Sequence, residues 1–119
     1  MAKDTAARTA EARAAAIRRA VRAVKRGSFA SYGEIARRAG LPGRARLVGQ
    51  VLRNSGDLRL PWHRITGAGG RVAFAPGSTS AREQLRLLAA EGVKIRGHRA
   101  VVERTAASTR SLDALLWKL

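Results

Sequence analysis

Residues 31–54 read SYGEIARRAGLPGRARLVGQVLRN, and this stretch predicts two short helices joined by a turn. Ser31 and Glu34 have the spacing of a capping box, in which each side chain satisfies a backbone N–H at the start of a helix. A short helix is therefore predicted over residues 32–38. Gly40 is the expected end of that helix, and the Leu-Pro-Gly triplet that follows indicates a tight turn.

A second helix is predicted over residues 44–54, directly after the turn. Its apolar residues are available for one inner face: Ala45, Val48, Val51 and Leu52. Two short helices across a glycine-containing turn are typical of a helix-turn-helix. Many small helical proteins contain a similar corner, so this pattern alone does not establish DNA binding.

A longer helix is predicted upstream of this unit. Apolar residues recur at helical spacing from Ile17 to Val24, while the opposite face is basic, and Gly27 is the expected stop. Residues 1–12 consist of Ala, Thr and charged residues after the initial methionine. This composition favours a flexible basic tail.

Downstream of the unit the sequence changes character. Residues 64–66 and 71–74 are expected to form short strands around a Gly-Ala-Gly-Gly turn, as a hairpin or a loose wing. Ser80 and Glu83 repeat the capping-box spacing, so another helix is predicted from residue 80 to about residue 91.

The last part of the chain is expected to hold a small ribbon and a tail. The ribbon falls within residues 93–103, and the tail covers residues 104–119, where Trp117 could return to pack on the domain. The predicted fold is mainly α with a small β wing, a winged helix-turn-helix-like domain over residues 13–103. The basic tail of residues 1–12 precedes it.

The charge of the chain points to a polyanionic partner. It has 24 Lys and Arg against 8 Asp and Glu, a net charge of +16. Repulsion of this size destabilises a compact state unless a polyanion relieves it. Nucleic acid is the first candidate and an acidic membrane surface the second.

The sequence also excludes several kinds of chemistry. It has no cysteine, which removes disulfides, thiolate metal sites and thiol nucleophiles together. The two histidines are far apart in sequence and no carboxylates cluster, so we expect neither a metal site nor a cofactor. No stretch reaches the roughly 18 apolar residues of a membrane span. We expect a cytoplasmic protein, associated with the nucleoid if it is bacterial.

Four motifs together resemble the DNA-binding domain of O6-alkylguanine-DNA alkyltransferases. They are SYGEIARR, ARLVGQVLRN, LPWHRI and LLAAEGVKI, in the order of that family and close to its spacing. The active site of the family reads Pro-Cys-His-Arg, whereas this chain has Trp62 after Pro61. With tryptophan at this position, the chain resembles the alkyltransferase-like branch of the family, which binds O6-alkylguanine and passes it to nucleotide excision repair.

The chemistry of Trp62 agrees with that resemblance. Alkyl transfer needs a nucleophile that is strong at neutral pH, such as a thiolate. The indole nitrogen is only a hydrogen-bond donor and cannot replace it. An indole does offer a large flat surface on which a base can stack. We therefore expect no enzymatic activity, and a site that holds a lesion rather than reacting with it.

The resemblance implies roles for residues around the lesion pocket. Arg46 matches the arginine that enters the duplex and fills the gap left by the flipped nucleotide; without the resemblance, the alternative is an arginine that contacts a phosphate. Tyr32 matches the tyrosine that presses on the target phosphate; the alternative is a tyrosine of the core. Asn54 matches the active-site asparagine; the alternative is an asparagine that caps a helix. Arg44 and Arg53 lie on the same helix as further DNA contacts.

The same resemblance implies a structural set next to Trp62. His63 and Glu91 match the pair that activates the cysteine in the family, but here there is no thiol to activate. We therefore expect them to hold the loop and the pocket edge. Pro61 belongs to the same motif, and Arg64 is expected to be an internal anchor rather than a DNA contact.

The resulting hypothesis is a monomer that binds O6-alkylguanine in double-stranded DNA by nucleotide flipping, through the minor groove, and directs it to nucleotide excision repair proteins. Two other classes stay open at this stage. A winged helix-turn-helix transcription regulator explains the charge and the helices, and so does a nonspecific DNA-coating protein. Neither explains a tryptophan after a proline in a chain with only two Trp, one Tyr and two Phe.

Overall fold

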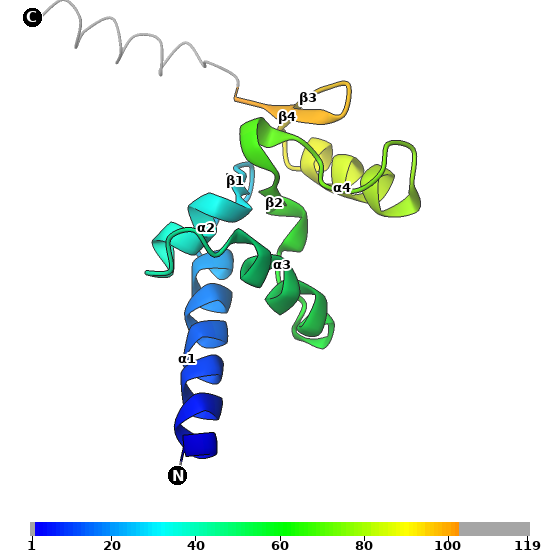
Figure 1. Cartoon of the computed structure of the whole chain (residues 1–119). Helices are drawn as coiled ribbons and strands as arrows, with labels where there is room; N and C mark the ends of the chain where they lie inside the picture. Colours follow the sequence, from blue (N-terminus) through cyan, green and yellow to red (C-terminus); the bar gives the residue numbers. More distant parts are fainter. Residues whose placement is uncertain (1, 103–119) are drawn as a thin grey trace, which may run out of the picture.

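The structure is a computed structural model that describes the backbone of residues 2–102 and the side chains from residue 9 onward. It is mainly helical, with four short strands in two separate pairs (Figure 1). The expected tail of residues 104–119, with Trp117, lies outside the described residues. The division of the chain into a domain and two tails stays a prediction.

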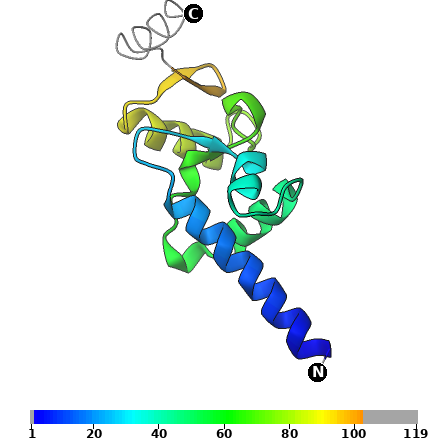
Figure 2. The same ribbon diagram turned by 90° about the vertical axis from the view of Figure 1, so that its left-hand side faces the viewer.

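The first helix, α1, runs over Ala2–Arg22. It begins well before the expected start at residue 13, so the helix includes the stretch interpreted as a flexible tail. Alanine, which supplies five of the eleven residues from 2 to 12, is the best helix former. In both views its N-terminal part extends away from the other elements (Figures 1 and 2). Among its described side chains, from residue 9 onward, the buried apolar residues lie in the later turns and include Ile17 and Val21.

The helix-turn-helix forms as predicted. Strand β1 (Ala30–Ser31) leads into α2 (Tyr32–Arg38), and α3 (Ala45–Asn54) follows the turn. The Ser31 hydroxyl accepts a hydrogen bond from the Glu34 backbone N–H at 3.1 Å, which is the expected helix cap. α1, α2 and α3 pack against one another. Their main buried residues form one apolar core: Ile17, Val21, Val24, Ile35, Ala36, Val48 and Val51.

The predicted hairpin between residues 64–66 and 71–74 is wrong. Strand β2 (Ile65–Thr66) instead pairs in parallel with β1. Residue 71 forms a single antiparallel bridge to Arg99, and the Val72 N–H donates to the His98 carbonyl oxygen at 3.0 Å. Both segments therefore find partners from distant parts of the chain. A local alternation of residues cannot reveal such partners.

Short 3₁₀ turns connect the strands and helices. They are η1 (Gly56–Leu58), η2 (Trp62–Arg64) and η3 (Ala68–Gly70). Gly70 adopts φ +82°, and a Cβ on it would collide with the carbonyl oxygen of Ala100. Only glycine allows the backbone of η3 to lie this close to the final strand.

Helix α4 (Thr79–Ala90) begins close to the predicted position but has a different cap. The Ser78 hydroxyl accepts from the Ala81 N–H at 3.2 Å, so the assignment of Ser80 and Glu83 as a capping box is wrong. Ser80 is already inside the helix. The predicted ribbon is confirmed: β3 (Lys94–Arg96) pairs antiparallel with β4 (Arg99–Val101). It lies at the end of the molecule opposite the start of α1 (Figures 1 and 2).

Candidate nucleic-acid interface

A pocket of about 640 Å³ lies beside α3. We call it the α3 pocket. Its lining comes from the start of α2, one face of α3, the start of η2 and the segment before α4: Tyr32, Ala45, Arg46, Gly49, Gln50, Leu52, Arg53, Trp62, Ala73 and Phe74. Three of the chain's five aromatic residues meet here, although they lie far apart in sequence. The volume falls in the range of roughly 300–1,000 Å³ typical of small-ligand sites.

Trp62 forms one wall of the α3 pocket from η2, directly after the half-buried Pro61. The Phe74 ring meets it edge to face, with centroids 6.0 Å apart and planes at 86°. The His63 ring lies edge-on at 6.2 Å. Edge-to-face contacts of this kind hold aromatic rings in defined orientations. The indole is therefore fixed by its neighbours and still only half-buried.

Arg46 stands at the rim of the α3 pocket, in the first turn of α3. It is exposed, as are Arg44 and Arg53. Within the described part of the chain, none of these three arginines forms an ion pair. A second hollow, of about 460 Å³, lies along the first turn of α3 and is lined by both Arg44 and Arg46. The recognition helix of the helix-turn-helix thus presents unpaired cations to the solvent.

Tyr32 is half-buried at the start of α2 and lines the α3 pocket. Burial raises the pKa of its hydroxyl, and the nearby Arg53 charge opposes that shift. The phenol therefore stays protonated at neutral pH and can donate a hydrogen bond.

Asn54 is placed differently from Tyr32, Trp62 and Arg46. It is the last residue of α3, is exposed, and is not among the residues that line the α3 pocket. The structure therefore does not bring it together with the other residues expected at the lesion. The cap of α3 is Ser55 rather than Asn54.

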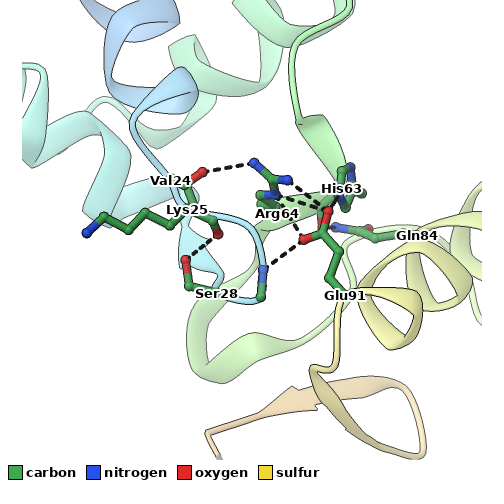
Figure 3. Close-up of polar contacts among 8 residues, drawn as sticks. Val24, Lys25, Ser28, His63, Arg64, Gln84 and Glu91 are labelled. Atoms are coloured by element: carbon green, nitrogen blue, oxygen red, sulfur yellow. Dashed lines mark hydrogen bonds and ion pairs between the residues drawn. The ribbon is translucent and has the colours of Figure 1, made fainter.

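A network of hydrogen bonds and ion pairs centred on Glu91 holds His63 and Arg64 of η2 (Figure 3). The His63 ring donates from Nε2 to Glu91 Oε2 at 2.7 Å. Arg64 donates to both carboxylate oxygens, from Nε at 3.0 Å and from Nη2 at 2.9 Å. The Gly27 N–H also donates to Oε1 at 3.0 Å, and Arg64 Nη1 reaches the Val24 carbonyl oxygen at 3.0 Å.

Through these contacts Glu91 connects three parts of the chain: the segment after α1, η2 and the end of α4. The Arg64 guanidinium, with help from His63 and Gly27, lowers the pKa of the Glu91 carboxyl to about 2, against the opposing effect of its burial. Only 8% of the Glu91 side chain is exposed. The Arg64 guanidinium is thus occupied by hydrogen bonds inside the protein.

Two residues of this region were missed by the sequence reasoning. Phe74 could have been suspected because the chain has only five aromatic residues. Gln84 is fully buried in α4 and donates from Nε2 to the carbonyl oxygens of His63 and Ile65, at 3.0 and 2.8 Å. Its signal was a polar residue between Ala81 and Leu88 on the apolar face of the helix.

The described residues contain no group of three or more histidine, cysteine or acidic residues that could hold a metal ion. Among residues 2–102 the structure has no helix that combines the length and the apolar character needed to cross a membrane. The fold and the site thus define a small helix-turn-helix DNA-binding domain with an aromatic pocket beside its second helix.

Comparisons with known proteins agree with this class. The family model of the 6-O-methylguanine DNA methyltransferase DNA-binding domain matches residues 12–93. Alkyltransferase-like protein 1 of Schizosaccharomyces pombe is 37% identical over 70 residues, 58% of this chain and 65% of that protein. The DNA base-flipping protein of Vibrio parahaemolyticus is 36% identical over 73 residues, 60% of this chain and 71% of that protein.

The solved structures point the same way. The crystal structure of S. pombe Atl1 in complex with damaged DNA containing O6-carboxymethylguanine is similar, with a TM-score of 0.65 and 29% identity. The similarity covers 77% of this chain and 89% of that one. The chain therefore belongs to the 6-O-methylguanine DNA methyltransferase DNA-binding-domain family, among its alkyltransferase-like, or base-flipping, proteins. It spans slightly less than two thirds of the S. pombe relative. With no cysteine in the sequence, it has no thiolate to accept an alkyl group.

Proposed function

We propose that this protein recognises O6-alkylguanine in duplex DNA by rotating the damaged nucleotide into the α3 pocket and holding it there without chemical repair. The observation that carries the proposal is the composition of that pocket. Aromatic walls, chiefly Trp62, stand beside an unpaired arginine on the second helix of a helix-turn-helix. A crystal structure of a relative with damaged DNA supports the same ligand class.

Trp62 supplies the stacking surface in this proposal. Base–aromatic stacking contributes about 1–3 kcal/mol per base. The indole is held by Phe74 and His63, at 6.0 and 6.2 Å between ring centroids, so it needs little ordering when a base arrives. Such preorganisation strengthens binding because less conformational freedom is lost. An alkyl group on O6 would extend into the same apolar space.

Arg46 supplies the group that replaces the rotated base. It lies at the mouth of the α3 pocket, and no carboxylate of the described residues holds it in place. A planar guanidinium can stack on a base and hydrogen-bond to it at the same time. Flipping costs a few kcal/mol, and less for a damaged base that pairs weakly, which contributes selectivity. We place α3 in the minor groove, which must open and bend as Arg46 enters.

The direct test is a comparison of affinities for two duplexes that differ in one base. The account predicts that a duplex with a single O6-methylguanine binds at least about tenfold more tightly than the same duplex with guanine, a difference of about 1.4 kcal/mol. A transcription regulator or a nonspecific coating protein would bind both duplexes equally. Equal affinities would therefore reject the proposal.

We further propose that the held lesion is handed to nucleotide excision repair. In this proposal the protein acts as a monomer in the cytoplasm, associated with the nucleoid if the source is bacterial. A protein that cannot remove the alkyl group leaves a bulky complex that marks the site for another system. Deleting the gene in a strain that lacks excision repair should add no further sensitivity to alkylating agents. An additive effect would contradict the handover.

A further inference from the structure

Two arginines of the β3–β4 ribbon and a third from the segment bridged to it form a row, and none of the three lines the α3 pocket. Arg96 and Arg99 are register partners across the ribbon, and Arg71 forms an antiparallel bridge to Arg99 from its other side. Residues directly opposite each other on neighbouring strands point to the same face, with Cβ atoms about 5 Å apart. The three side chains, which we call the arginine row, therefore share one face.

The opposite face of the ribbon is the one that packs on the protein. Ile95 and Ala100, the residues that alternate with the arginine row, pack in a small core with Leu88 and Val93. Gly70 lies directly under Ala100. The three arginines are all exposed and line a hollow of about 490 Å³ together with Pro76 and His98. The row is thus fixed on a packed support and faces solvent.

Like charges directly opposite each other in a sheet destabilise it. Among the described residues, no member of the arginine row forms an ion pair that would relieve this repulsion. Glu34 lines a neighbouring hollow with Arg96 and Arg99, but its carboxylate is paired with Arg38 at 2.9 Å. Three unrelieved guanidinium groups in a row match an extended anion rather than a single carboxylate.

The arginine row is also tied to the α3 pocket. His98, in the turn of the ribbon, donates from Nε2 to the Phe74 carbonyl oxygen at 2.8 Å. Phe74 in turn contacts Trp62. Arg71 precedes Phe74 by three residues, so their Cα atoms lie at most about 11 Å apart. One wall of the α3 pocket is therefore connected to the row through both Arg71 and His98.

We infer that the arginine row is a second phosphate-binding site, which holds the backbone of the same duplex to one side of the flipped nucleotide. The row spans about 10 Å, given neighbours about 5 Å apart. One strand of B-DNA carries about three phosphates over that length of its axis. The inference rests on the proposed function, which gives the position of the duplex. The phosphate contacts of the arginine row are measured by the salt dependence of affinity, separately from the preference for the lesion.

The test compares R96Q/R99Q with K25Q/R26Q, which removes two exposed charges near the end of α1 instead. Affinity for an O6-methylguanine duplex with long flanks is measured as a function of salt. Each lost phosphate contact lowers the slope of log K against log salt by about 0.9, so R96Q/R99Q should lose about 1.8. Between 50 and 200 mM salt its affinity should therefore fall about tenfold less than that of the wild type. K25Q/R26Q should keep the wild-type slope.

Trimming the flanks then locates the contact. When DNA is removed on the side that the arginine row contacts, the slope of log K against log salt of the wild type should fall to that of R96Q/R99Q. The slope of the variant should not change further. The ratio of lesion to plain affinity should be the same for both proteins. Any of three results would overturn the inference. R96Q/R99Q could keep the wild-type salt slope, or K25Q/R26Q could lose as much of the slope as R96Q/R99Q. The difference in slope between the wild type and R96Q/R99Q could also persist whichever flank is trimmed. A wild type without lesion preference would reject the proposed function instead.

Discussion

Trp62 and Phe74 meet edge to face, with ring centroids 6.0 Å apart and planes at 86°. The two residues come from separate segments, one in η2 and one in the stretch before α4. Both residues line the α3 pocket, so their contact is part of its wall. Phe74 therefore supports Trp62 in this wall.

Replacing Phe74 should weaken lesion binding selectively. An edge-to-face pair contributes about 0.5–1.5 kcal/mol, so Phe74→Ala should lower affinity for O6-methylguanine DNA about fivefold while affinity for plain DNA stays unchanged. Fluorescence anisotropy with both duplexes measures this. Phe74→Leu, which keeps apolar bulk, should lose less. A loss shared equally by the two duplexes would remove Phe74 from the lesion site.

Arg46 and Arg44 are a matched pair, because both are exposed arginines at the start of α3. Arg46→Ala should reduce lesion affinity about tenfold or more and abolish the fluorescence rise of 2-aminopurine placed beside the lesion. Arg44→Ala should cost only a phosphate contact, and it should leave that rise intact. If the two variants behave alike, Arg46 does not enter the duplex.

The Glu91 network predicts a specific dependence of stability on pH. The folded pKa of about 2 lies below the ordinary value of 4.5, so the carboxylate stabilises the fold above pH 4.5 and loses this effect as pH falls toward 2. Glu91→Gln should cost about 2–3 kcal/mol of unfolding free energy at pH 7, the contribution of hydrogen bonds to a charged group. Denaturant titrations should show the difference shrinking between pH 4.5 and 2.

The exposed pair of Glu83 and Arg86 provides the control for that experiment, with N and O 2.7 Å apart. Glu83→Gln should leave the unfolding free energy nearly unchanged at every pH, because solvent screens an exposed ion pair. A cost for Glu83→Gln equal to that for Glu91→Gln would show that the network has no special role.

Gly70 and Gly40 test whether the ribbon is fixed on η3. Both have positive φ, +82° and +79°, but only a Cβ at Gly70 meets another segment, the Ala100 carbonyl. Gly40→Ala should cost about 1–2 kcal/mol, the left-handed backbone penalty. Gly70→Ala should cost about 1–3 kcal/mol more because of the collision. Equal thermal shifts for the two variants would contradict the close approach.

The helix-turn-helix could be predicted because its signals are local. The Ser31 cap, the stop at Gly40 and the apolar spacing of α3 each act within a few residues. The parallel pairing of β1 with β2 could not be predicted, because the two strands lie far apart in sequence. Each strand has only two residues, which is too short to show an alternating pattern. For the same reason a local hairpin was predicted where none forms.

The site was predicted only in part. Trp62, Tyr32 and Arg46 do come together, and the family resemblance was the source of that expectation. Asn54 does not line the pocket, although it is the last residue of the helix that contributes one face of the lining. Phe74 was missed because its position depends on the ribbon, through the His98 hydrogen bond to its carbonyl oxygen.

The most direct test of recognition without repair uses one duplex that carries a radiolabelled methyl group on O6 of a single guanine. The account predicts that the protein retains this duplex in preference to an excess of unmodified duplex, and that after denaturation all of the label remains with the DNA. The sequence contains no cysteine to receive the methyl group. Label found on the protein, or no preference for the methylated duplex, would contradict the account.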